Sequence, residues 1–345
     1  VYGWPEPAFD EFYRKRRILG FTVHIVTDPD MVGRVLLDNK ENYLRPRIAQ
    51  RILSPLIGNG LLSSEGEDWK KQRRIVAPTF APGAVAKMAG AIARVATRQT
   101  AGWLHGAIRT DMARAATDAT MQIIADTLFS SDARLTARVA GEHIDNLVLA
   151  SGQARVSTLL GLQNFDITPL MVRARRGRVY LRNTLTAMVR ERGPSGGADD
   201  FFGGLIRALY DQFPAAEAEA LAVDNAITFY VAGHETTANA LAWTIYLLAA
   251  QPGLQEEARA EAVAALDGDV TTLADRLPLL RQILDEAMRL YPPAPRFDRE
   301  ARADGGADVV QVGRGRGRPA SRHPAPLPPP PAGRPHRFAS PPATS

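Results

Sequence analysis

The sequence predicts a mainly α-helical fold with a small N-terminal β region and a disordered C-terminal tail, and three observations lead to this. Alanine-rich patterns with the helical period of 3.6 residues occupy most of the chain between residues 31 and 290. A β-rich segment, 21–30, precedes them and ends in a turn sequence, Asp-Pro-Asp. Near residue 302 the composition changes abruptly, and Pro, Arg, Gly and Ala make up 30 of the last 44 residues.

This change predicts two parts, a helical domain over 1–301 and a low-complexity tail over 302–345. The tail holds seven arginines and two aspartates, which accounts for the whole net charge of +5. The body is therefore balanced, and the high pI indicates no acidic partner. The Arg-Gly repeats resemble those of single-strand nucleic-acid binders, but such proteins stack bases on aromatic side chains. Only Phe338 is aromatic in the tail, so we expect no nucleic-acid partner.

Ten segments of the body have helical patterns with the usual start and stop signals. Residues 63–66, Ser-Ser-Glu-Gly, precede the second segment, a glycine-rich loop at 193–197 separates the sixth from the seventh, and Pro292-Pro293 follows the last. The segments are 31–39, 68–76, 82–104, 112–129, 137–150, 171–192, 200–210, 220–250, 254–266 and 278–290.

Cysteine is absent from the 345 residues. This excludes disulfides, zinc sites built on thiolates and thiol catalysis in the chain as given. The first residues contain neither a basic segment nor an apolar one, so no signal peptide is visible. No membrane anchor is visible either, and we expect a cytoplasmic location.

The longest apolar segment, 220–250, has the length of a membrane span. Its middle, 232–239, has the sequence Ala-Gly-His-Glu-Thr-Thr-Ala-Asn, and a carboxylate near the centre of a span costs about 2.5–3.5 kcal/mol. A single buried helix crossing a globular domain fits better. We expect a distortion near Gly233–Thr236, because threonine hydroxyls can bond to the preceding turn and bend a helix, and we expect Ala232 and Thr236 to be buried.

The polar insertion allows two other interpretations. A polar contact between helices would satisfy a buried glutamate without any chemistry. A zinc-protease site begins with His-Glu but needs a second histidine one turn later, and residue 238 is alanine. The zinc-protease interpretation therefore fails.

The sequence Ala-Gly-x-Glu-Thr-Thr in a long apolar helix resembles the oxygen-binding helix of the cytochromes P-450. The resemblance implies that Ala232 and Gly233 let the helix pass over the haem face. It also implies that Glu235 and Thr236 form an acid–alcohol pair that relays protons, because oxygen cleavage consumes protons in a pocket that excludes water. His234 should face elsewhere and take no part.

A second landmark lies at 286–295, with the sequence Glu-Ala-Met-Arg-Leu-Tyr-Pro-Pro-Ala-Pro. By itself a Glu–Arg pair three residues apart is commonly an exposed contact. With the proline-rich exit it resembles the Glu-x-x-Arg helix of the same family, which implies that Glu286 and Arg289 form a buried structural lock. Arg337, in a Pro-x-Arg-Phe sequence of the tail, would be its third member.

A third landmark is Trp69-Lys-Lys-Gln-Arg73. The spacing of four places both outer side chains on one face of a helix, where an indole N–H and a guanidinium can bond one propionate. The alternative is a basic helix surface with a half-buried tryptophan. The family resemblance favours propionate binding by Trp69 and Arg73, and Arg299 matches a second propionate-binding position.

The chain departs from the family at one point: the loop that carries the axial cysteine is absent, so no residue provides a metal ligand. Between 302 and 321 Gly-Arg repeats replace the expected β-rich connection, and sequences similar to the family return at 322–325 and 335–338. We interpret this as a disturbed reading frame near residue 302 or a C-terminal truncation. A genuine low-complexity tail is the alternative.

The resemblance implies a haem-dependent monooxygenase with haem b, which inserts one atom of O2 into an organic substrate. We expect a small hydrophobic substrate and a ferredoxin- or flavodoxin-type electron donor, as in soluble bacterial enzymes. Without the cysteine we expect this chain to be inactive. The alternative is a non-catalytic helical protein that at most binds small molecules.

Overall fold

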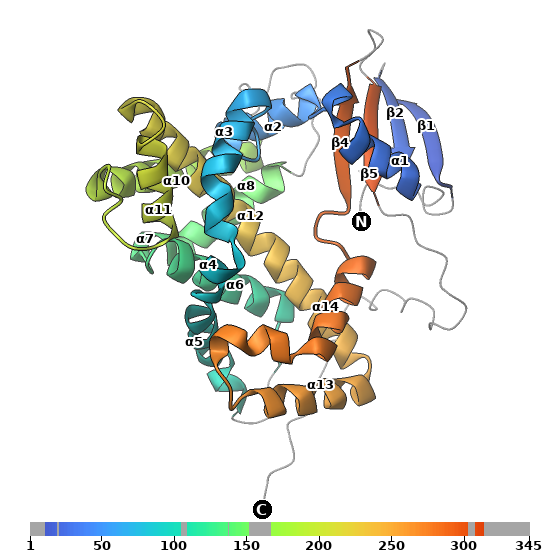
Figure 1. Ribbon diagram of the computed structural model, residues 1–345, viewed down its shortest axis with the longest axis vertical. Coiled ribbons are helices and arrows are strands. Elements are labelled where there is room, and N and C mark those ends of the chain that lie inside the picture. The colour runs from blue at the N-terminus through green and yellow to red at the C-terminus, as the bar shows by residue number, and fades with distance from the viewer. Residues whose placement is uncertain are drawn as a thin grey trace, which may run out of the picture. The chain divides into compact units, whose positions relative to one another are not determined.

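The computed structural model describes residues 11–18, 21–104, 109–136, 138–151, 167–302 and 308–313. These residues divide into two compact units. The first contains the chain up to Arg51 together with the residues from Ala294 onward, and the second contains Ile52–Pro293. The fold is mainly helical with one small sheet, as the sequence predicts (Figure 1).

A five-stranded sheet forms the first unit, with the strand order β1-β2-β5-β4-β3. Strands β1 and β2 pair antiparallel, β2 and β5 pair parallel, and β4 is antiparallel to both β5 and β3. The strands are β1 (Tyr13–Ile18), β2 (Phe21–Val26), β3 (Tyr43–Leu44), β4 (Arg296–Ala301) and β5 (Asp308–Gly313).

Strand β5 corrects the predicted boundary of the tail, because residues 308–313 belong to the sheet. Val310 and Val312 are buried and pack with Val26 and Val35. The alternation of Val310 and Val312 with Gln311 is the pattern of a half-buried strand. An average composition over 44 residues hides so short a strand, which explains the error.

The helical cover of this sheet begins at Asp28, whose carboxylate accepts hydrogen bonds from the amides of Asp30 and Met31. Helix α1 (Pro29–Gly33) therefore starts two residues before the predicted helix. A π-helical turn, η2 (Arg34–Asp38), and a short 3-10 turn, η3 (Lys40–Asn42), follow it.

Helix α2 (Arg47–Ile57) leads into the second unit, which is helical. Most of the predicted helices are present there within a few residues. The elements are α3 (Gly66–Val76), η4 (Ala77–Phe80), α4 (Pro82–Ala86), α5 (Ala89–Thr100), η5 (Ala101–Leu104), α6 (Met112–Leu128), α7 (Ala133–Thr136), α8 (Arg138–Ser151), α10 (Pro169–Arg192), α11 (Phe201–Tyr210), α12 (Ala215–Ala249), α13 (Pro252–Ala265), η7 (Val270–Arg276) and α14 (Pro278–Leu290).

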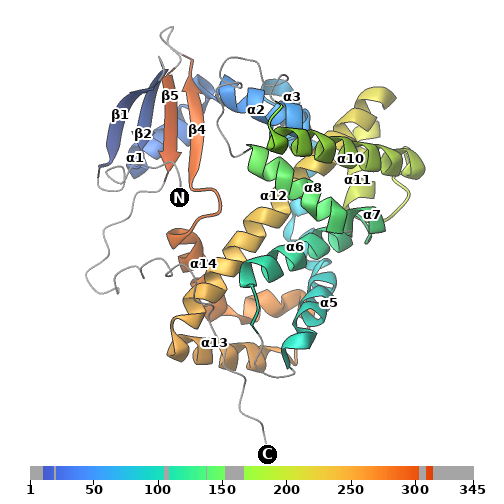
Figure 2. The same cartoon turned by 180° about the vertical axis from the view of Figure 1, so that it is seen from behind.

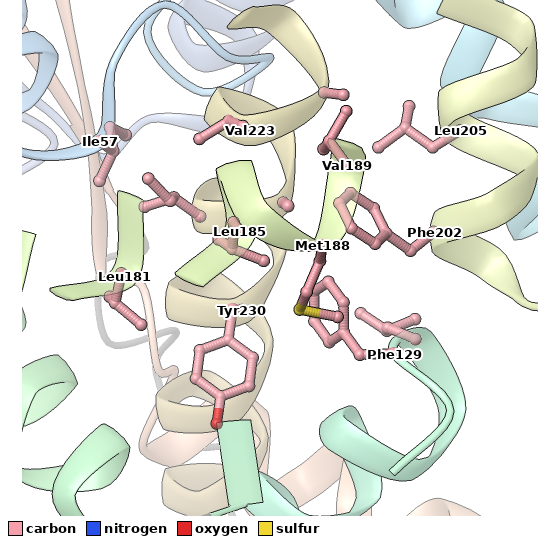
Figure 3. Packing of buried hydrophobic residues seen from close by; sticks show 14 of the residues in the cluster. Ile57, Phe129, Leu181, Leu185, Met188, Val189, Phe202, Leu205, Val223 and Tyr230 are labelled. Carbon is pink, nitrogen blue, oxygen red and sulfur yellow. The ribbon is translucent and has the colours of Figure 1, made fainter. Parts of the chain in front are cut away.

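Helix α12 is the centre of this unit and runs for 35 residues without a break. Helices α6, α10, α11 and α14 all pack against it (Figures 1 and 2). Residues 221–228 are buried on every side. Around them lies the main core (Figure 3), where the labelled residues include Phe129, Leu185, Met188, Phe202 and Tyr230.

Helices α8 and α10 cross closely in the same unit. At Gly177 an added Cβ would lie 2.7 Å from the backbone oxygen of His143, so only glycine fits. Next to this crossing the rings of His143 and Tyr180 lie 4.8 Å apart, and the Tyr180 hydroxyl donates to the Arg134 carbonyl.

The membrane interpretation of the long apolar segment is not supported. Within the part of the chain that the structure describes, no single helix has both the length and the apolar composition of a span. Only a pair bent by 52°, Gly66–Phe80 with Pro82–Trp103, meets these two requirements together.

Candidate active-site helix

From Ala232 onward, one side of helix α12 is no longer covered by other helices of its unit and carries exposed residues. Successive residues of an α-helix are turned by about 100°, so Ala232, Thr236 and Asn239 share one face. Ala232 is half-buried and the other two are exposed, whereas His234 and Ala238 on the opposite face are buried. His234 therefore faces away from the open side, as predicted.

Two expectations about this region were wrong. Thr236 is exposed and Ala232 is half-buried, although we predicted both to be buried. No break or change of helix type occurs near Gly233 either. The Thr236 hydroxyl donates to the Ala232 carbonyl at 2.8 Å, and the helix accommodates this bond without interruption.

Gly233 makes room for another helix. An added Cβ would lie 2.8 Å from Ile124 Cδ1 of α6. Gly233 is also turned about 100° from Ala232, so it lies beside the open face and not at its centre. In this structure the missing side chain therefore serves the packing of α6 against α12.

Glu235 lies at the border between the two faces of α12. Partial burial of its carboxyl is the main cause that raises its pKa above the ordinary value, and the charge of Asp145 raises it further. The neighbouring His234 acts in the opposite direction and lowers it. A carboxyl with a raised pKa holds its proton to a higher pH than an ordinary glutamate, which suits a group that takes up and releases protons.

The predicted propionate-binding residues lie on α3. Trp69 is half-buried and Arg73 is exposed, and their spacing of four places them on one side of the helix. Between them Gln72 points inward, and its side chain is 1% exposed. The side-chain amide of Asn225 on α12 donates to Gln72 Oε1 at 2.8 Å, and Gln72 Nε2 donates to the Asn59 carbonyl at 3.1 Å.

This polar clamp, made of Gln72, Asp224, Asn225 and the loop 58–61, was missed by the sequence analysis. Asp224 accepts from the Asn59 amide at 2.7 Å and from Arg182 at 2.5 Å. Asn225 accepts from the Leu61 amide at 2.9 Å. The signal was present, because an aspartate and an asparagine in an apolar helix need partners, but the sequence does not say which residues provide them.

Glu286 and Arg289 on α14 are paired but not buried. Two guanidinium nitrogens of Arg289 each donate to a Glu286 carboxylate oxygen at 2.6 Å. The two side chains are 50% and 45% exposed, so the expected burial of this lock is wrong. The buried positions of α14 are Ile283 and Ala287, and the pair lies on the other face. Arg337 lies outside the described residues.

The exit of α14 is anchored to α12 by an aromatic stack. The rings of Tyr291 and Trp243 are 3.9 Å apart and inclined by 7°. Tyr246 meets the Trp243 ring edge-on at 5.6 Å. This stack places the start of the proline-rich sequence next to the C-terminal part of α12.

Arg299 lies on β4 of the first unit. It is half-buried, and its guanidinium donates to the Asp298 carbonyl at 2.9 Å. Burial raises the pKa of the Asp298 carboxyl, and the charges of Arg296 and Arg299 partly oppose this. Arg299 thus lies in a charged segment of the sheet.

The residues present do not complete a haem site. The open face of α12 offers small and polar side chains on which a flat group could lie, but the 345 residues contain no cysteine. Each described histidine is engaged: His24 with the Tyr13 hydroxyl, His143 with the Tyr180 ring, and His234 facing Asp145. Among the described residues no cluster of three metal-ligating side chains occurs.

Comparisons with known proteins find relatives that match most of this chain. A relative from Streptomyces melanosporofaciens, cyclooctat-9-en-7-ol 5-monooxygenase, is 32% identical over 277 residues, which cover 79% of this chain and 59% of the relative. Cyclooctatin synthase from the same organism is 28% identical, over 80% of this chain and 61% of the relative. Cytochrome P450 714D1 of Oryza sativa subsp. japonica is 27% identical, over 84% and 54%.

The chain thus spans about three fifths of the length of these relatives. A crystal structure of a cytochrome P450, CYP102L1, is similar in fold with a TM-score of 0.68 and 21% identity, over 87% of this chain and 70% of that one. The family model described as Cytochrome P450 matches residues 15–306. The chain belongs to the cytochrome P450 family.

Proposed function

We propose that this cytochrome P450 fold is that of a haem-dependent monooxygenase, which inserts one oxygen atom of O2 into an organic substrate, and that activity requires a cysteine ligand that the 345 residues do not contain. The observation that carries the proposal is the pair of Glu235 and Thr236, both exposed where the open face of α12 begins. The raised pKa of Glu235 supports its role as the proton donor of the pair. Bound haem would supply the redox chemistry with O2.

The chain's own residues have separate tasks in this proposal. Glu235 takes a proton from solvent, and Thr236 passes it on through a hydroxyl that both accepts and donates. Ala232 keeps the open face of the helix narrow, so that a flat cofactor can lie against it. Gly233 lies beside this face and lets α6 pack closely behind it. Arg73, with Trp69, would bind one propionate, because guanidinium groups pair well with carboxylates. For Arg299, a propionate-binding role is proposed from the family resemblance alone.

The lack of cysteine leads to a second part of the proposal. We infer that the 345-residue chain by itself neither forms the thiolate-ligated site nor catalyses turnover, since thiolate ligation is what favours cleavage of the O–O bond. The same observation favours the alternative of a non-catalytic protein that binds small molecules. The two candidates differ in whether a cysteine supplied to this fold restores the site.

The substrate and the partners follow from the resemblance. We propose a small hydrophobic substrate, and cyclooctat-9-en-7-ol is a reasonable first compound to test because it appears in the name of a relative. The proposed electron donor is of the ferredoxin or flavodoxin type, and the proposed location is the cytoplasm.

Carbon monoxide difference spectroscopy tests the proposal. The 345-residue chain reconstituted with haem and reduced should give no thiolate-type, red-shifted Soret band. A version carrying the cysteine loop of the family after residue 313 should give that band. In the same version, the Thr236→Ala variant should consume electrons from the donor without forming product and should release peroxide.

A red-shifted band from the cysteine-free chain would refute the ligand argument. If the loop-carrying version binds haem through its thiolate but turns over no substrate with any donor, the non-catalytic alternative holds.

A further inference from the structure

The turn of α12 that carries Glu235 and Thr236 is held from its buried side by two other helices. On α6, the Thr120 hydroxyl lies 3.0 Å from the backbone oxygen of His234. On α8, Asp145 Oδ1 lies 3.9 Å from His234 Nε2. The backbone of His234 is therefore in contact with α6, and its ring faces the Asp145 carboxylate of α8 at a distance longer than a hydrogen bond.

The contact with α6 depends on a matched pair of helix faces. Thr120 and Ile124 are four residues apart and so share one face of α6. Ile124 fits against Gly233, where an added Cβ would lie 2.8 Å from Ile124 Cδ1 and would force that methyl group to shift. This close approach brings the Thr120 hydroxyl within reach of the next carbonyl along α12. Thr120 and His234 are each only 2% exposed, so water cannot replace the bond easily.

Holding His234 helps to fix the rotation of α12 about its own axis, together with the packing of α6, α10, α11 and α14 against it. Because each residue is turned by about 100° from the last, His234 on the buried side sets Glu235 at the border and Thr236 on the open face. We propose that Thr120, acting through His234 and assisted by Asp145, positions the Glu235–Thr236 pair. The inference rests on the proposed function for the task of that pair. Thr120 is a positioning residue and does not touch the reacting groups.

An electrostatic link supports the geometry. After burial, the charge of Asp145 is a further cause that raises the pKa of Glu235, and His234 lowers it. The groups that hold the turn thus also act on the Glu235 carboxyl. A change in the pKa of Glu235 would therefore indicate that the turn of α12 around His234 has moved.

The chain offers a matched control on the same helix. The single proton of the Thr120 hydroxyl is shared among three carbonyls, those of Ala116 at 2.9 Å, His234 at 3.0 Å and Thr117 at 3.1 Å, and only the His234 carbonyl belongs to α12. The Thr117 hydroxyl donates at 2.9 Å to the Ala113 carbonyl of its own helix. Thr120→Val and Thr117→Val both remove a hydroxyl and keep the branched shape, and only Thr120 reaches α12.

Hydrogen exchange on the 345-residue chain tests whether Thr120 stabilises the turn of α12 around His234. In Thr120→Val the amides of residues 234–240 should exchange roughly threefold to tenfold faster, as expected for the loss of one ordinary hydrogen bond. In Thr117→Val they should exchange at the original rate, and Thr120→Ser should restore it. Equal exchange in the two valine variants would overturn the proposal.

A carbon-13 NMR titration of the Glu235 carboxyl separates positioning from mere stabilisation. Asp145→Asn should lower its pKa, because a raising charge is removed. Thr120→Val should also move this pKa although threonine carries no charge, and Thr117→Val should leave it alone. An unmoved Glu235 pKa in Thr120→Val would contradict positioning. Neither measurement uses haem, so this inference and the proposed function can fail independently.

Discussion

The two halves of helix α12 carry polar residues for different reasons. In the first half Asp224 and Asn225 are buried, and each is bonded to a loop or a helix of the same unit. In the second half Glu235, Thr236 and Asn239 are exposed on or beside one face. The comparison teaches that a polar residue in an apolar helix is structural where the chain itself satisfies it. Where the chain leaves it facing outward, it is available for a ligand or a reaction.

The largest expected loss of stability comes from a substitution in the first half of α12. Asn225→Leu removes the donor to Gln72 Oε1 where both residues are buried, and we expect a loss of about 3 kcal/mol in the free energy of unfolding. Asn239→Leu makes the same change in the second half and should cost less than about 0.5 kcal/mol. Urea unfolding of both variants measures the difference, and equal losses would contradict the distinction between the halves.

The next effect concerns the loop that clamps the first half. Gly58 has φ +77° and a side chain there would collide with the Asp224 carboxylate, whereas Gly66 has φ +61° and open space around it. Both alanine variants share the backbone strain of about 1–2 kcal/mol. The free energy of unfolding of Gly58→Ala should fall by about 2 kcal/mol more than that of Gly66→Ala, because of the collision with Asp224. If thermal unfolding shows the same loss for both variants, the clamp does not depend on this close approach.

A smaller effect of opposite sign is expected at the open face. The pKa of Glu235 is raised in the folded state, so the folded protein prefers the protonated carboxyl. Stability from this preference is complete at low pH and is lost as the pH rises through the folded pKa. Glu235→Gln should therefore raise the melting temperature at pH 7 and not at pH 4. A lower melting temperature at pH 7 would show that the charged form is the favoured one.

The smallest effect is expected at the exposed pair on α14. Glu286→Gln should change the free energy of unfolding by no more than about 0.5 kcal/mol, the usual range for a surface ion pair. A buried lock would lose about 3–5 kcal/mol. Urea unfolding at low and high salt distinguishes the two, because only a surface contact weakens as salt is added.

Periodicity predicted most helices within a few residues, and helical geometry correctly predicted that His234 faces away from the side of Thr236. What the sequence could not provide were pairings between distant segments. The Gln72–Asn225 bond joins residues 153 positions apart, and no local pattern specifies it. Strand β5 was missed because it gains its stability from neighbours on both sides. The burial of Glu286 was inferred from the family resemblance and is wrong, because Glu286 lies on the exposed face of α14.

The stack of Trp243 on Tyr291 gives the protein an optical reporter of its own. Two aromatic rings held parallel at 3.9 Å couple their electronic transitions, so the pair should give a distinct near-ultraviolet circular dichroism band. That band would disappear in Tyr291→Leu while the far-ultraviolet helix spectrum stayed the same. The docking of the α14 exit could then be followed in solution without any label, during refolding or on addition of haem.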